Sequence, residues 1–142
     1  MNDPTPFEVW RDVRALVING LDRYRRHAVD VIGLPFSRIR ALRRLLNGPL
    51  THAALAEAMM VDRPAVTVAV DDLCARGLVV RQTHPTDRRC KLVALTEPGR
   101  LLAERIETLV PPPPQGWDEL PPEELAVLAA VANRLAKKHA AR

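Results

Sequence analysis

The sequence predicts a mainly α-helical fold that contains one small antiparallel β-hairpin. Three observations support this fold class. Apolar side chains recur at spacings of three and four over most of the chain, as on one face of a helix. Between Gly77 and Thr96 the pattern changes to two short runs typical of strands. Basic residues are in excess between residues 34 and 95, which indicates where an acidic partner would bind.

The composition is that of a single domain, residues 1–142, without a membrane anchor. The 142 residues suffice for one modest core, and 47% of them are hydrophobic. No segment approaches the roughly 20 uninterrupted apolar residues of a membrane span, and the N-terminus does not resemble a signal peptide. The two cysteines lack a metal-binding spacing and fit a reducing compartment. We therefore expect a cytoplasmic protein.

Positive charge is unevenly distributed along the chain. The formal net charge is +4. Residues 1–33 contain five basic and five acidic residues, residues 34–95 contain ten and five, and residues 96–142 contain six and seven. A DNA-binding segment needs such an excess for phosphate contact, although many proteins are mildly basic without binding nucleic acid.

A long N-terminal helix is expected over residues 6–32. Thr5, Pro6 and Glu8 are typical of a helix start, and Gly33 favours a helix end. An apolar stripe at spacings of three and four contains Trp10, Val13, Val17, Leu21, Tyr24, Ala28 and Val31. Such a helix is roughly 40 Å long, which exceeds what the core of so small a domain needs. We favour a subunit interface along this stripe; packing within the chain is the alternative.

A second helix is expected between Leu34 and Asn47. Its buried side would consist of five apolar residues: Phe36, Ile39, Leu42, Leu45 and Leu46. Four basic residues fall largely on the opposite side: Arg38, Arg40, Arg43 and Arg44. These arginines could contact a DNA backbone, or they could form an ordinary solvated helix face.

Two short helices joined by a tight turn are expected next. Thr51 is a suitable N-cap for the first, which extends to Met59. Asp62 can cap the second, because its carboxylate accepts hydrogen bonds from free N–H groups and suits the positive helix end. Pro64 lies in the first turn, where its missing N–H has no cost, and Gly77 can end the helix. The buried face of the second helix would consist of Val66, Ala69, Val70 and Leu73.

A basic β-hairpin follows these helices. Its two strands are expected at residues 78–81 and 91–95. Pro85 and Asp87 favour a turn between them, and Arg88 and Arg89 lie at or near its tip. A helix-turn-helix followed by such a hairpin is the winged-helix pattern. Its second helix can enter a DNA major groove, and the arginines of the hairpin can reach a minor groove.

This stretch resembles the MarR (multiple antibiotic resistance regulator) family of bacteria and archaea. The matching residues are Leu50, Thr51, Leu55, Ala56, residues 62–67, Leu73, residues 77–79, Arg81, residues 87–89, Leu95, Thr96, Gly99 and Arg100. The resemblance covers about residues 30–105 well and the rest by architecture. It implies a winged helix-turn-helix with a DNA-binding segment at residues 34–95 and with N- and C-terminal dimerisation helices.

The resemblance also implies which residues contact double-stranded DNA. These candidates lie on the two short helices and at the hairpin tip: Thr51, Arg63, Pro64, Ala65, Thr67, Val68, Arg88 and Arg89. Arg63 can pair with guanine or phosphate, and Thr67 can reach a base or a phosphate. Val68 replaces the longer polar residue that family members often carry, so base readout would rest on few side chains. Arginines at the hairpin tip suit the negative potential of a narrow minor groove.

Two acidic residues, Asp71 and Asp87, are expected to orient the hairpin. The resemblance implies that Asp71 pairs with a hairpin arginine, and a solvent-facing carboxylate is the alternative. One of Arg88 and Arg89 would enter the minor groove while the other braces Asp87 or Asp71. The sequence does not distinguish between them.

The C-terminal part is predicted to form two helices separated by prolines. Thr96 caps the first, and the four prolines from Pro111 stop it. The Pro-rich link at residues 111–122 is unusual for the family and is interpreted as a rigid spacer; a ligand for a proline-binding domain is the alternative. The last helix is expected from Pro122 to His139. Residues 6–32 and 97–139 would then form the dimer interface, with Trp10, Val13, Val17, Trp117, Leu125, Leu128 and Leu135.

No catalytic or cofactor motif is visible. The chain lacks a glycine-rich phosphate loop, a nucleophile elbow and an HExxH motif, and its four histidines are scattered. We therefore expect no enzyme activity, no metal and no cofactor. Cys74 and Cys90 could be thiol switches on DNA binding; incidental or structural cysteines are the alternative.

Together these observations predict a sequence-specific repressor that binds a near-palindromic operator as a homodimer. The resemblance implies that a small apolar or phenolic effector weakens DNA binding by favouring one of two dimer states. The alternative function is a winged helix used for protein–protein contact.

Overall fold

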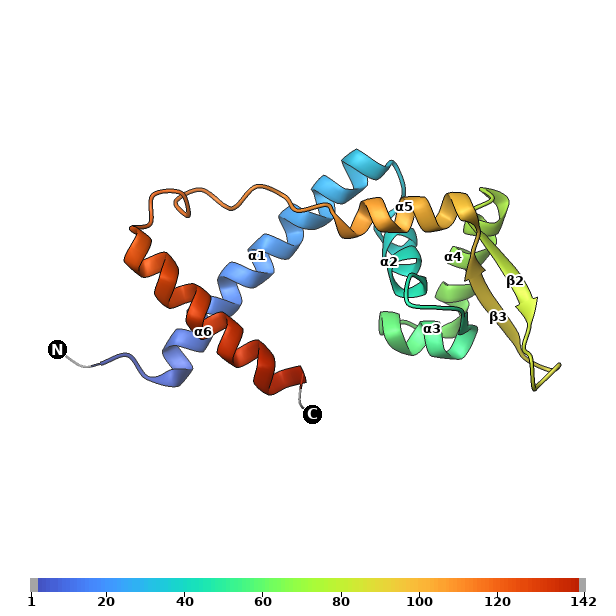
Figure 1. Cartoon of the computed structure of the whole chain (residues 1–142), viewed down its shortest axis with the longest axis horizontal. Coiled ribbons are helices and arrows are strands. Elements are labelled where there is room, and N and C mark those ends of the chain that lie inside the picture. The colour runs from blue at the N-terminus through green and yellow to red at the C-terminus, as the bar shows by residue number, and fades with distance from the viewer. Residues whose placement is uncertain (1–2, 141–142) are drawn as a thin grey trace. The chain divides into compact units, whose positions relative to one another are not determined.

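The structure, a computed structural model, describes residues 3–140 and confirms the mainly helical fold with a small antiparallel sheet (Figure 1). One compact unit ends at Pro111 and a second begins at Pro112. The elements are α1 (Pro6–Ile32), α2 (Phe36–Leu45), β1 (Leu50–Thr51), α3 (His52–Met59), α4 (Arg63–Ala75), β2 (Val79–Thr83), β3 (Lys91–Leu95), α5 (Glu97–Glu107) and α6 (Pro122–Ala140).

Helix boundaries follow the capping residues of the sequence. Thr5 and Glu8 form a capping box, in which the Thr5 hydroxyl accepts from the Glu8 N–H at 3.3 Å and Glu8 accepts from the Thr5 N–H at 2.8 Å. Gly33 ends α1 with a φ of 75°, a left-handed conformation that costs glycine little. Thr51, Asp62 and Thr96 cap α3, α4 and α5 through their side chains. These predicted caps are confirmed.

The core lies among α2, α3, α4, α5 and the sheet. Helix α4 buries the predicted face of Val66, Ala69, Val70 and Leu73. Helix α5 contributes Ala103 and Ile106 to the same cluster, although residues 97–139 were assigned to the dimer interface. From α1, only the C-terminal end joins the cluster, through Ala28 and its neighbours. The winged-helix lobe therefore comprises residues 34–109.

The sheet has three strands, whereas we predicted only the two strands of the hairpin and missed β1. Their order is β1-β3-β2, with β1 antiparallel to β3. Strand β1 contains only two residues, which is too short for a recognisable alternation. Strand β2 begins at Val79 because Leu78 closes the turn that follows α4, where its N–H donates to the carbonyl of Leu73 at 3.0 Å.

Three of the four arginines on α2 bind groups of their own chain. Arg38 Nε lies 2.8 Å from Asp72 Oδ2 of α4, and Arg43 Nε lies 2.6 Å from Glu107 Oε1 of α5. Arg40 donates to the backbone carbonyl of Met59, at the end of α3. These arginines therefore connect α2 to α3, α4 and α5, which the sequence alone did not indicate.

Most apolar side chains of α1, and those of α6, are exposed. The seven predicted dimer residues all have exposed side chains: Trp10, Val13, Val17, Trp117, Leu125, Leu128 and Leu135. Within α1, the stripe is exposed as far as Leu21, so the other elements of its own unit do not cover it. Helix α5 ends at Glu107, before the prolines, and residues 109–121 contain no helix or strand. Among the described residues, no helix has the length and apolarity needed to cross a membrane.

Candidate nucleic-acid interface

A tight turn fixes the direction of α4 relative to α3. Met60 ends α3 in the left-handed region, with a φ of 54°, and its side chain is exposed. The N–H of Val61 donates back to the carbonyl of Ala56 at 3.0 Å. Asp62 then starts α4, because its Oδ1 accepts from the N–H of Ala65 at 2.9 Å. The turn leaves the N-terminal end of α4 uncovered within the lobe.

The predicted contact residues of α4 share its exposed face. Arg63, Pro64, Ala65, Thr67 and Val68 are all exposed, while the opposite face is buried in the core. Thr67 Oγ1 donates to the carbonyl of Arg63 at 3.1 Å, so its oxygen can still accept a hydrogen bond. This face offers one guanidinium, one hydroxyl and one branched apolar side chain to a partner.

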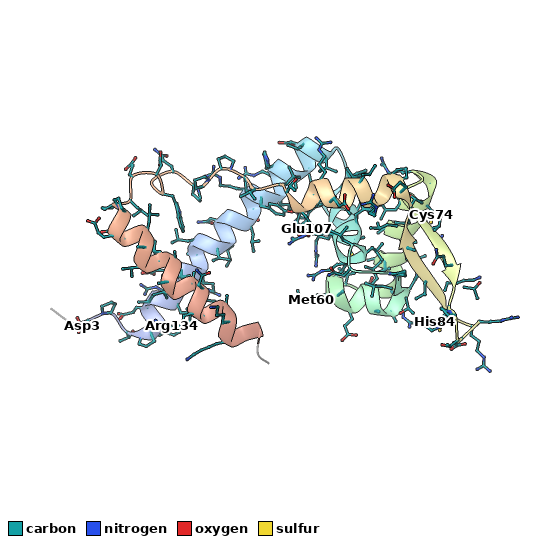
Figure 2. All side chains as sticks on the ribbon, in the orientation of Figure 1. Asp3, Met60, Cys74, His84, Glu107 and Arg134 are labelled. Atoms are coloured by element: carbon teal, nitrogen blue, oxygen red, sulfur yellow. The ribbon has the colours of Figure 1, made fainter. Side chains whose placement is uncertain are left out.

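The wing, residues 79–95, consists of β2, β3 and the turn between them, and it extends away from the helices of the lobe (Figure 1). Its strands pair antiparallel from Val79 opposite Leu95 to Thr83 opposite Lys91. His84 lies at the far end of the wing, where its Nδ1 is 3.2 Å from the N–H groups of Thr86 and Asp87 (Figure 2). This role of His84 in shaping the turn was not predicted.

Asp87 shapes the tip through backbone groups. Its Oδ1 accepts from the N–H of Arg89 at 3.0 Å, and its carbonyl accepts from the N–H of Cys90 at 3.1 Å. We predicted that Asp87 could bind an arginine side chain. Instead, it accepts a hydrogen bond from the backbone of Arg89. Arg88 and Arg89 remain exposed.

Asp71 pairs with Arg81 of β2, which confirms the predicted pairing with a hairpin arginine; the predicted brace between Asp71 and Arg88 or Arg89 at the tip is not formed. Arg81 also donates to Cys74 Sγ at 3.4 Å, so it bridges two residues on α4 (Figure 2 labels Cys74). The physical reason is position along the wing: Arg81 lies in the strand next to α4, while the other two arginines lie in the turn. Asp71 still connects α4 to the wing.

A hollow of about 490 Å³ lies between the start of α3, the exposed face of α4 and the wing. Its lining residues are Thr51, His52, Ala53, Arg63, Thr67, Arg81, Arg89, Cys90 and Lys91. It brings together four predicted contact residues, Thr51, Arg63, Thr67 and Arg89. The other four, Pro64, Ala65, Val68 and Arg88, lie outside it. His52, Arg81 and Lys91 were missed, because only the packed fold places them beside α4.

The lining of the hollow is strongly cationic. Four of the lining side chains are basic and none is acidic. Arg81 is neutralised by Asp71, but no carboxylate of the described residues lies within ion-pair distance of Arg63 or Arg89. Such an open, cationic arrangement attracts an anion.

The thiol of Cys90 lies beside an acidic side chain. The carboxylate of Asp87 raises the pKa of the Cys90 thiol, with burial as a second cause. A raised pKa keeps the thiol protonated, and the protonated form is a weak nucleophile. Within residues 3–138, no group of three or more histidine, cysteine or acidic side chains is placed to hold a metal ion.

Comparison with known proteins identifies the family. The model of the MarR family matches residues 32–89. The HTH-type transcriptional repressor NicR of Pseudomonas putida is 33% identical over 110 residues, which cover 73% of this chain and 68% of that protein. The chain belongs to the MarR family. This MarR family protein is also 44% identical over 70 residues to a protein of Thauera aromatica named as a transcriptional regulatory protein for the hcr operon.

The matches differ in how much they cover. The Thauera match spans 49% of this chain and only 42% of the relative's length. The crystal structure of apo MarR from E. coli is similar over 94% of this chain and 98% of that one, with a TM-score of 0.71 and 23% identity. This likeness confirms the winged-helix fold. The family consists of DNA-binding transcriptional regulators, so the predicted class of this protein is confirmed.

Proposed function

We propose that this protein is a homodimeric repressor that binds a near-palindromic operator through α4 and the wing of each subunit. The single observation that carries this proposal is the cationic hollow, in which Arg63 and Arg89 face the same opening from α4 and from the wing. Two unneutralised guanidinium groups on adjoining elements are suited to successive phosphates of a DNA backbone.

Within each half-site, α4 would enter the major groove with its exposed face. Arg63 would pair with guanine or with a phosphate, and Thr67 would accept or donate at a base edge. Val68 is 59% exposed and donates no hydrogen bond, so it suits the methyl group of thymine. Base recognition therefore rests on three side chains of this helix.

The two arginines at the wing tip would take different roles. Arg89 lines the hollow beside α4, whereas Arg88 lies outside it on the same turn. We assign phosphate contact to Arg89 and insertion into the minor groove to Arg88. A narrow minor groove concentrates negative potential, which favours an inserted guanidinium.

The dimer would form through α1 and α6, whose apolar stripes are exposed in the single chain. Two recognition helices would then reach successive major grooves, about 34 Å apart. A small apolar or phenolic effector would weaken operator binding if it favoured a dimer with a different spacing. The names of the relatives, a repressor and an operon regulator, support repression as the direction of control.

The first test measures binding to a labelled duplex from the gene's own upstream region, with a scrambled duplex as the control. We expect tight binding to the native duplex that falls steeply as salt rises, with about −0.9 added to the log–log slope for each neutralised phosphate. Equal and weak binding to both duplexes, and to fragments from a genomic screen, would favour the alternative of a protein–protein module.

The second test separates the two wing arginines. Arg88→Ala and Arg89→Ala should each weaken operator binding about tenfold while leaving thermal unfolding unchanged. Arg89→Ala should also reduce the salt slope by about 1, which marks a phosphate contact. Arg105→Ala, on the exposed side of α5, is the matched control. Wild-type affinity in both wing variants would contradict the groove proposal.

A further inference from the structure

His52 lies in the hollow and can change its charge near neutral pH. It is the first residue of α3 and shares one wall of the hollow with Thr51 and Ala53. The facing walls carry Arg63 from α4, together with Arg81, Arg89 and Lys91 from the wing. A histidine among cations, with an unperturbed pKa near 6.5, is suited to respond to an arriving anion.

In the free protein, the surroundings of His52 favour the neutral imidazole. Its pKa is lowered mainly by partial burial and then by the charge of Arg81. Arg63 lowers it further, and Asp71 opposes these effects. Since the pKa falls below 6.5, the side chain is largely uncharged at neutral pH.

The other elements packed against α3 do not alter this balance. Strand β1 has no charged side chain, and β3 presents Lys91 at the hollow. On α2, Arg38 is bound to Asp72, and Arg43 to Glu107. Arg40 binds the carbonyl of Met59, at the end of α3 opposite His52.

We propose that His52 is a DNA-backbone contact that takes up a proton as a phosphate enters the hollow. The inference rests on the proposed function. Phosphates bound at Arg63 and Arg89 would offset the positive charges that now disfavour the imidazolium, and would themselves attract it. The proton comes from solvent, and protonated His52 then donates a hydrogen bond to a phosphate oxygen.

Proton uptake makes operator binding depend on pH. The association constant rises as pH falls whenever the complex binds more protons than the free partners do. Between pH 8 and pH 6 we expect the affinity of the dimer to increase about tenfold, because two copies of His52 contribute. The salt dependence should also become steeper at pH 6, since each protonated His52 adds one cation to the contact with the DNA backbone.

The experiment measures affinity for the native upstream duplex from pH 6 to pH 8 at fixed salt. His52→Gln should remove most of the pH dependence, and His52→Lys should bind at pH 8 about as tightly as the wild type binds at pH 6. His27→Gln, a histidine change on α1 outside the hollow, should keep the wild-type dependence. Thermal unfolding of each variant shows that it remains folded.

A second measurement follows the imidazole of His52 directly by NMR, with and without the duplex. We expect its pKa to lie below the ordinary value in the free protein and above it in the complex. An unchanged pKa, or the same pH dependence of affinity in the wild type and in His52→Gln, would overturn this inference alone. Absence of specific duplex binding at every pH would overturn the proposed function and this inference with it.

Discussion

The winged-helix lobe buries many of its apolar side chains, whereas the two terminal helices expose most of theirs. Apart from Ala28, every fully buried apolar side chain of the described residues lies between Leu34 and Ile106. In contrast, α1 exposes its apolar stripe up to Leu21, and α6 exposes Leu125, Leu128 and Leu135. The lobe thus completes its core within one chain, whereas the terminal helices present faces suited to a second copy.

The ion pairs follow the same division. Three pairs of the lobe connect different elements: Arg38 to Asp72, Arg43 to Glu107 and Arg81 to Asp71. The other pairs of the lobe are local to α4 or α5. In α1, Arg11 pairs with its neighbour Asp12. Surface pairs contribute little stability one by one, but pairs between elements restrict how those elements can shift. The three pairs between elements therefore restrict the movement of α2, α4, α5 and β2 relative to one another.

The largest expected effect tests the lobe at Gly99, near the start of α5. A Cβ at this position would lie 1.8 Å from the carbonyl oxygen of Leu78. That oxygen already accepts the N–H of Thr96 at 3.1 Å, so the backbone has no room to move away. Gly99→Ala should lower the free energy of unfolding by about 3 kcal/mol or more, at the upper end of overpacking costs.

Thermal or urea unfolding of Gly99→Ala measures this cost, with Gly20→Ala as the matched control. If the variant has the same free energy of unfolding as the wild type, α5 can move away from Leu78 without cost. In that case the lobe would be less completely packed than its buried residues indicate, and the contrast with the terminal helices would weaken.

The second expected effect tests the exposed face of α6. Leu128→Arg should weaken dimerisation about 100-fold, because burying a leucine in each of two copies contributes about 3 kcal/mol in total. Operator binding should fall with it. Ala130→Arg is the control, since its side chain is also exposed and points to the other side of the helix.

Sedimentation equilibrium distinguishes these outcomes. Monomers for Leu128→Arg and dimers for Ala130→Arg would support an interface along the predicted stripe. Dimers of equal strength in both variants would contradict the role of α6, and would leave α1 as the helix that holds two copies together.

The sequence predicted those parts of the fold that local chemistry determines. Asp62 before Pro64, and Thr96 before Gly99, mark helix starts through hydrogen bonds that span only three residues. The exposed face of α4 followed from its helical period. Local signals of this kind are visible without knowledge of the fold.

The sequence did not predict features that depend on packing between distant residues. Strand β1 is defined by its pairing with β3, and has no pattern of its own. Asp71 pairs with Arg81, and not with the arginines of the tip, because β2 lies next to α4 and the tip does not. The fold places His52 in the hollow, and only this placement indicates a role for it. In each case the deciding contact joins residues that are separated along the chain.

The smallest expected effect tests α1 at Gly20, in the middle of the helix. Beyond its chain neighbours and the backbone of its own helix, no atom of the described residues lies within 4 Å of a Cβ at this position, in contrast to Gly99. Glycine destabilises a helix interior by about 0.5–1 kcal/mol relative to alanine, so Gly20→Ala should stabilise the protein by about that amount in thermal unfolding. If the variant instead weakens the dimer, the partner subunit must approach α1 closely at this position. Weaker dimerisation would place the interface at Gly20, whereas a stabilised protein with an unchanged dimer would show that the partner's backbone does not approach this position.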